Sequence, residues 1–301
     1  MEKGTIKKTI ITAIGGFFMA LADSVPGVSG GTVAFLLGFY DDFIGSLDKL
    51  FRGSFQEKKI ALIWLIKLGI GWVIGFLLAA TILSSLFTTK IYAMSALFLG
   101  FIFGAVPLVI KEEKESIIGK YRNIIFTILG IALVVLITIA NTKGGITVDF
   151  NNLNIFSYLY IFFAASLAIC AMVLPGISGS TLMLIFGLYI PIMGKIKDFI
   201  HFDFSGFPIL CVFGLGIIFG IVAIVGLIKK GLEKFRPSMI YLILGLMLGS
   251  LYSIIMGPTT LENPQPMMDI NIFIKNIPFF ILGIVIIFGL ELSKKLLNKG
   301  E

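Results

Sequence analysis

The sequence predicts an all-α polytopic membrane protein whose two halves are copies of one unit. Composition is the first observation, because 57% of the 301 residues are apolar, only 14% are charged, and the mean hydropathy is +1.04. Soluble domains carry about a quarter charged residues. Second, several apolar stretches approach the ~20 residues that a helix needs to cross the hydrocarbon core. Third, one glycine-rich motif occurs once in each half of the chain.

The repeated motif reads VPGVSGGT at residues 25–32 and LPGISGST at residues 174–181. Chance similarity between apolar helices is common, but an ordered series of glycines with a shared polar motif is not. We therefore predict two repeats, residues 1–145 and 146–301. A shift of 149 residues pairs Pro26 with Pro175. A shift of 145 pairs Gly71 and Gly75 with Gly216 and Gly220, and also Gly100 and Gly104 with Gly245 and Gly249. A shift of 153 pairs Gly130 with Gly283.

Each repeat is expected to contain one broken segment and three continuous transmembrane helices. Proline and glycine end a helix, so the motif breaks the segments 9–48 and 155–196. Glycines spaced four apart in the other segments predict close helix–helix contacts. The expected spans are 60–87, 92–110 and 123–140 in the first repeat, and 208–228, 238–256 and 273–292 in the second.

The distribution of positive charge predicts how the repeats lie in the membrane. If each broken segment is a re-entrant hairpin, each half crosses three times and the two halves are inverted. Most of the 24 basic residues then lie on the cytoplasmic side, as the positive-inside rule requires. We expect six full spans, two re-entrant hairpins and cytoplasmic N- and C-termini.

The motif is expected to bind an anion. Ser29 and Ser178 are suited to cap a second half-helix, and the following glycines are expected to leave backbone N–H groups bare. A helix N-terminus with free N–H groups attracts anions, and hairpins from opposite faces can meet near the midplane. The alternative is that the motif only permits tight packing. The expected binding residues are Ser29, Gly30, Gly31, Thr32, Ser178, Gly179, Ser180 and Thr181, and the expected helix-break residues are Pro26, Gly27, Pro175 and Gly176.

Asp23 is the acidic residue nearest the first break. Ionisable groups at membrane depth are costly and often functional. We expect Asp23 to carry a coupling proton or to orient the loop; the alternative is that it binds loop N–H groups or water. Its partner in the second repeat is Met172. Tyr40 and Tyr189 also match between the repeats and are expected to have symmetric structural roles.

The motifs resemble those of bacterial polyprenyl-phosphate (undecaprenyl-phosphate) translocases of the PopT type. The resemblance rests on DSVPGVSGGT at residues 23–32, on LPGISGST in the second half and on a G-x-Y after each, and it covers almost the full chain. It implies that undecaprenyl phosphate is returned from the outer to the inner leaflet of the cytoplasmic membrane, which recycles the lipid carrier for cell-envelope polymer synthesis. Composition and spacing point only to an inverted repeat with an anion site.

Other functions are weighed against this one. A small-anion secondary transporter or channel is the alternative, because it can use the same paired half-helices. A phosphatase with a histidine nucleophile is disfavoured, since the only histidine, His201, falls in a predicted loop. Cys170 and Cys211 lie in apolar surroundings without metal-ligand spacing. We expect no catalytic residue, metal, cofactor or nucleic acid. Proton coupling, sodium coupling and movement of the substrate down its own gradient are all compatible with the sequence, which does not predict an oligomeric state.

Overall fold

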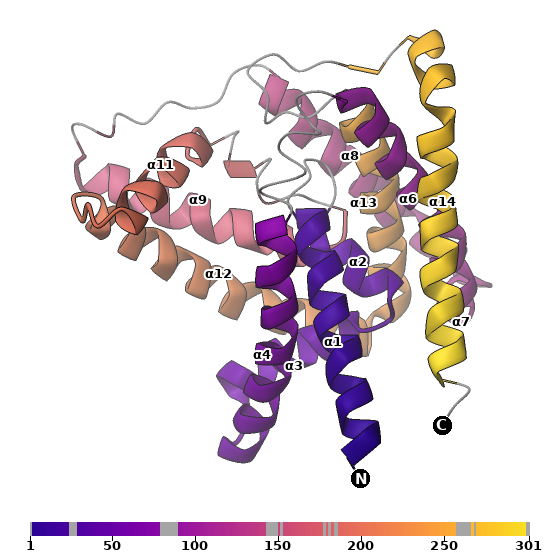
Figure 1. Cartoon of the computed structure of the whole chain (residues 1–301), viewed down its shortest axis with the longest axis horizontal. Helices are drawn as coiled ribbons and strands as arrows, with labels where there is room; N and C mark the ends of the chain where they lie inside the picture. Colours follow the sequence, from indigo (N-terminus) through magenta and orange to yellow (C-terminus); the bar gives the residue numbers. More distant parts are fainter. Residues whose placement is uncertain are drawn as a thin grey trace.

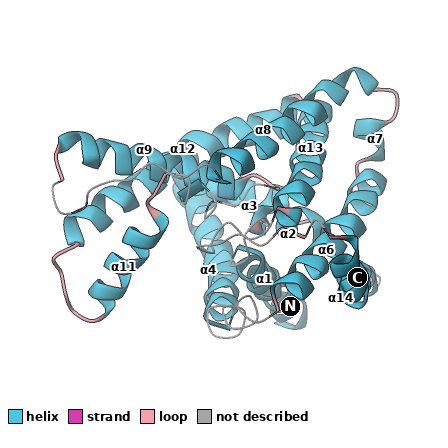
Figure 2. Ribbon diagram, turned by 90° about the horizontal axis from the view of Figure 1, so that it is seen from above, coloured by secondary structure: helices cyan, strands magenta, loops and turns pink. Residues whose placement is uncertain are grey.

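The computed structural model describes residues 2–23, 29–78, 90–142, 150, 153–176, 179, 182–183, 186–256, 266–267 and 269–298. These residues form helices and short connections, with no strand among them (Figure 2). Seven helices in the described ranges are long and apolar enough to cross a membrane, so the chain is a multi-pass membrane protein. They are α4 (Phe55–Leu78), α6 (Ile91–Glu112), α8 (Ile124–Thr142), α9 (Ile155–Val173), α12 (Phe207–Lys234), α13 (Arg236–Ile255) and α14 (Ile270–Asn298).

The remaining elements precede or connect these helices. They are α1 (Glu2–Asp23), α2 (Gly30–Leu36), α3 (Tyr40–Arg52), α7 (Lys114–Ile117), the 3-10 turn η2 (Tyr121–Asn123) and α11 (Tyr189–Ile200). The N-terminal end of α1 and the C-terminal end of α14 point to the same end of the molecule, the bottom of Figure 1.

Local sequence explains where several helices begin. α4 starts at Phe55, earlier than the expected 60, because Ser54 and Glu57 form a reciprocal cap in which the Ser54 N–H donates to Glu57 Oε2 over 2.9 Å. α9 starts after Asn154, which forms a capping box with Ser157. α9 then runs 19 residues to the extended Leu174, so this part of the second broken segment is long enough to span.

Two helix pairs lie within the predicted repeats. α1 packs along α4, and α9 packs along α12 (Figure 1). Glycines allow the contact in both pairs. A side chain at Gly71 or Gly75 of α4 would collide with backbone carbonyl groups of α1, and the same holds for Gly216 or Gly220 of α12 against α9. The predicted close helix contacts are confirmed at these four glycines.

Two further pairs join one repeat to the other. α6 packs along α14, and α8 packs along α13. Gly100 of α6 meets Phe280 and Gly283 of α14, while Gly245 of α13 meets Thr127 and Gly130 of α8. By the shifts that align the predicted repeats, Gly100 corresponds to Gly245 and Gly130 corresponds to Gly283. The two contacts are therefore equivalent, with the roles of the two halves reversed.

Charged side chains also connect the halves. Asp48 of α3 accepts a hydrogen bond of 2.7 Å from Lys229 of α12, and Arg52 donates to the Val222 carbonyl oxygen over 2.8 Å. Arg236 at the start of α13 contacts Glu113 and Asp41. Exposed ion pairs contribute only about 0–1 kcal/mol each, so packing of the apolar helices supplies most of the contact between the halves.

A pair of glycine substitutions tests the helix packing. We expect Gly71→Ala to destabilise the protein by about 1–3 kcal/mol, because the added methyl overlaps the Ala13 carbonyl group. Gly69→Ala is the matched control, since no atom lies within 4 Å of its methyl position, and alanine favours a helix by ~1 kcal/mol over glycine. Thermal unfolding in detergent measures both variants.

The second repeat offers the same comparison, with Gly216→Ala expected to destabilise and Gly214→Ala expected to be tolerated. Equal melting temperatures for the two members of either pair would contradict the packing.

Candidate functional site

The start of α2 is built from the first motif. Ser29 has an extended backbone, and its Oγ accepts a hydrogen bond of 3.1 Å from the Gly31 N–H. The predicted N-cap role of Ser29 is therefore confirmed. Ser29 is only 1% exposed, and its hydroxyl lies 3.2 Å from the carbonyl oxygen of Met172 and 3.1 Å from that of Leu174.

The end of α9 brings the second motif against the first. The Gly176 N–H donates to Thr32 Oγ1 over 2.8 Å. A methyl group at Gly31 would lie 2.8 Å from the Val173 carbonyl oxygen, so the backbones approach closely. We call the contact between residues 29–32 and residues 172–176 the motif junction. It joins two segments that are far apart in the sequence.

Two further residues shape the motif junction. The Tyr40 hydroxyl donates to the Val173 carbonyl oxygen over 3.1 Å. Gly176 has a φ of +90°, which favours glycine, and a methyl group there would lie 2.5 Å from the Leu246 carbonyl carbon. The end of α9 therefore turns tightly at Gly176 and packs directly on α13.

Asp23 binds the start of α2. Its carboxylate accepts hydrogen bonds from the Gly30 N–H over 2.7 Å and from Trp72 Nε1 over 3.2 Å. This bears out the alternative in which Asp23 binds a loop N–H group. The absent side chain of Gly30 makes room for the carboxylate, since a methyl group there would lie 2.5 Å from Asp23 Oδ2.

The expectation of bare N–H groups is wrong for α2. The Gly30 N–H donates to Asp23, the Gly31 N–H donates to Ser29 Oγ, and the Thr32 N–H donates to the Ser29 carbonyl oxygen over 2.9 Å. The physical reason is that a polar group inside a membrane protein must find a partner within the protein. An anion at this position is nevertheless stabilised, because the Asp23 carboxylate itself occupies the helix N-terminus.

The corresponding contact in the second half carries no charge. Gly179 corresponds to Gly30, and a methyl group there would lie 3.0 Å from Cβ of Met172, the residue that corresponds to Asp23. An apolar contact thus replaces the carboxylate contact. The remaining expected site residues lie outside the described residues; they are Pro26, Gly27, Ser178, Ser180 and Thr181.

The described part of the chain holds no group of three or more His, Cys, Asp or Glu side chains that could hold a metal ion. Cys170 is half-buried, and its thiol lies 3.5 Å from the Gly220 carbonyl oxygen, while Cys211 is exposed. His201 lies in the turn after α11.

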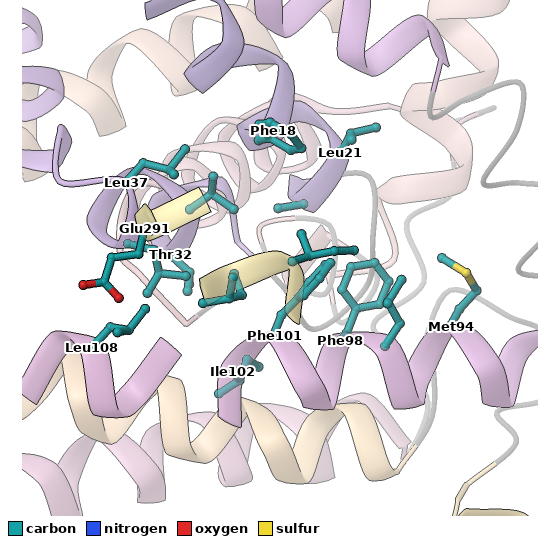
Figure 3. A pocket seen from close by; sticks show the side chains of 16 residues that line it. Phe18, Leu21, Thr32, Leu37, Met94, Phe98, Phe101, Ile102, Leu108 and Glu291 are labelled. Atoms are coloured by element: carbon teal, nitrogen blue, oxygen red, sulfur yellow. The ribbon is translucent and has the colours of Figure 1, made fainter. Parts of the chain in front are cut away.

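Sequence reasoning missed an apolar pocket beside the motif junction. The pocket has a volume of about 230 Å³ and is lined by α1, α2, α6 and α14 (Figure 3). Thr32 lines it from α2, and Glu291 lines it from α14. No sequence pattern marks the pocket, because its walls come from four separate helices. Trp72 was also missed, since only the folded chain brings its indole to Asp23.

Comparisons with known proteins agree with the resemblance noted in the sequence. Residues 19–272, which include both motifs, match the family model "VCA0040-like: Undecaprenyl phosphate translocase-like". A polyprenyl-phosphate transporter of Staphylococcus aureus is 33% identical over 286 residues, 92% of this chain and 94% of that protein. A polyprenyl-phosphate transporter of Vibrio cholerae is 29% identical over 259 residues, 82% of this chain and 78% of that protein.

No solved structure gives a significant match to this chain. The family match extends over both halves and over every described residue of the motif junction. The chain therefore belongs to the VCA0040-like family of undecaprenyl phosphate translocase-like proteins.

Proposed function

We propose that this protein carries undecaprenyl phosphate from the outer to the inner leaflet of the cytoplasmic membrane, so that the lipid carrier is reused for cell-envelope polymer synthesis. The family description and the names of the two relatives support transport of a polyprenyl phosphate. One observation carries the proposed site: the motif junction gathers the hydroxyls of Ser29 and Thr32 and the N–H of Gly176 at one buried place.

The proposal includes an inverted repeat with both termini in the cytoplasm. Its support is that the α6–α14 contact and the α8–α13 contact use corresponding glycines of the two halves. Two halves related by a two-fold axis produce such a pair of equivalent contacts. The common direction of the two chain ends in Figure 1 agrees with termini on one side. α2 packs on α1, as the arms of a re-entrant hairpin do.

The lipid phosphate is proposed to bind by exchanging partners at the motif junction. Phosphate oxygens accept hydrogen bonds from the same N–H and hydroxyl groups that now bind carboxylate and carbonyl oxygens. In this scheme the phosphate takes the place of the Asp23 carboxylate at the Gly30 N–H. Since two anions cannot share one donor at low energetic cost, neutralisation of Asp23 by a coupling proton favours the exchange.

Transport of the lipid itself is tested in vesicles that contain the purified protein and undecaprenyl phosphate. Outer-leaflet phosphate is followed with a membrane-impermeant binder, while chloride and inorganic-phosphate fluxes are followed in the same preparation. We expect lipid exchange without ion flux. Ion flux without lipid exchange would replace the proposal with a small-anion transporter or channel.

Removal of the Ser29 hydroxyl tests the motif junction. We expect Ser29→Ala to slow leaflet exchange about tenfold, because a lost buried hydrogen bond costs about 1–3 kcal/mol. Ser166→Ala is the matched control, since Ser166 is also buried and its hydroxyl contacts two backbone oxygens, those of Phe162 and Gly216, outside the motif junction. Equal exchange rates in the two variants would place the phosphate elsewhere.

Neutralisation of Asp23 tests the coupling. If a proton releases the carboxylate, exchange by the unmodified protein rises as the pH falls, and Asp23→Asn loses this part of the pH dependence. Trp72→Phe is the control, because it removes one hydrogen bond to Asp23 but keeps the charge. The rate of leaflet exchange is measured at a series of pH values, with the same pH inside and outside the vesicles. A pH profile that is unchanged in Asp23→Asn excludes Asp23 as the coupling residue.

A further inference from the structure

The apolar pocket beside Thr32 adjoins the motif junction. We propose that this pocket holds the first isoprene units of the lipid chain, next to the phosphate. This inference rests on the proposed function, and it assigns the chain and the phosphate to different parts of the protein.

The pocket has the chemistry of a hydrocarbon site. Of its sixteen lining residues only Thr32 and Glu291 are polar, and the others are aliphatic, aromatic or methionine. In Figure 3 Thr32 and Glu291 lie together at one end, and Met94 and Phe98 lie at the other. A volume of about 230 Å³ is too small for a whole polyprenyl chain, so the pocket fits only its first units.

The polar end of the pocket explains why the chain enters and the phosphate does not. Glu291 is a carboxylic acid side chain that lines the same end as Thr32. A carboxylate within about 4–6 Å of a phosphate repels it in a low-dielectric site. The phosphate is therefore expected outside the pocket, at the motif junction, while the uncharged chain occupies the pocket.

The apolar wall of the pocket has an apolar counterpart in the second half. By the shifts that align the repeats, the lining residues Ala22, Val33, Leu97, Phe101 and Ile287 correspond in turn to Ala171, Leu182, Leu242, Leu246 and Val134. These five counterparts belong to one hydrophobic cluster, and four of the lining residues, Ala22, Val33, Leu97 and Phe101, belong to or pack against the main hydrophobic core.

Photolabelling of the unmodified protein tests the proposal without a change in its packing. The probe is a polyprenyl phosphate with a diazirine on its first isoprene unit, added to the protein in vesicles. We expect the label mainly on the lining residues of α6 and α14, and we expect unlabelled polyprenyl phosphate to suppress it. Label spread over exposed residues such as Ile70 of α4 or Leu136 of α8, with no enrichment in the pocket, would overturn the proposal.

Two adjacent residues of α14 provide matched variants. Ile286 lines the pocket, whereas Val285 is 58% exposed and does not. We expect Ile286→Trp to lower both labelling and leaflet exchange about tenfold, because the indole fills the pocket, and Val285→Trp to change neither.

The outcomes separate the two proposals. The unmodified protein could exchange the lipid between leaflets while the two tryptophan variants show equal labelling and equal rates. That result would overturn the pocket assignment and leave the proposed function standing. No exchange of polyprenyl phosphate by the unmodified protein would overturn the proposed function, and the pocket assignment with it.

Discussion

The contact between the start of α2 and the end of α9 is the interaction on which the rest of the structure depends. Both segments are helix ends buried inside the protein, and helix ends leave backbone groups without intrahelical partners. Here the two ends supply partners for each other: the Ser29 hydroxyl faces the carbonyl oxygens of Met172 and Leu174, and Thr32 Oγ1 accepts a hydrogen bond from the Gly176 N–H. Without these contacts the buried helix ends would leave polar groups unsatisfied, each at a cost of several kcal/mol.

That contact requires small residues on both segments. Side chains at Gly31 or Gly176 would meet the backbone of the facing segment, and the helix pairs around them rely on glycines in the same way. These contacts recur in corresponding places in the two halves, so the fold repeats its close approaches as well as its sequence. A structure built on such contacts accepts few substitutions at the motif junction but many on the exposed faces of its helices.

The halves differ where function is proposed. The residue that corresponds to Asp23 in the second half is Met172, so a carboxylate in one half corresponds to a thioether in the other. Ion pairs from Asp48 to Lys229 and from Arg236 to Glu113 cross between the halves. Unequal polar groups at corresponding positions can present two different environments to one ligand.

The sequence contained enough information to predict the all-helical membrane class, the cap at Ser29 and the close contacts at glycines such as Gly71, because these depend on local residue type and periodicity. It left open whether Asp23 carries a proton or binds an N–H group, and it did not identify the Gly30 N–H as the donor to Asp23. That contact depends on how far the chain folds back after α1, and no spacing rule encodes it. The pocket escaped prediction for a similar reason, since its walls are assembled from helices distant in sequence.

The central claim is that the lipid phosphate replaces Asp23 at the motif junction, and Trp72 reports on it most directly. The chain has two tryptophans, so Trp64→Phe leaves Trp72, whose indole N–H donates to Asp23, as the only one. Fluorescence of this variant in detergent is titrated with polyprenyl phosphate and, in parallel, with the polyprenol that lacks the phosphate. The account predicts a saturable spectral change with the phosphate alone. An identical change with both lipids, or none with either while leaflet exchange persists, would contradict it.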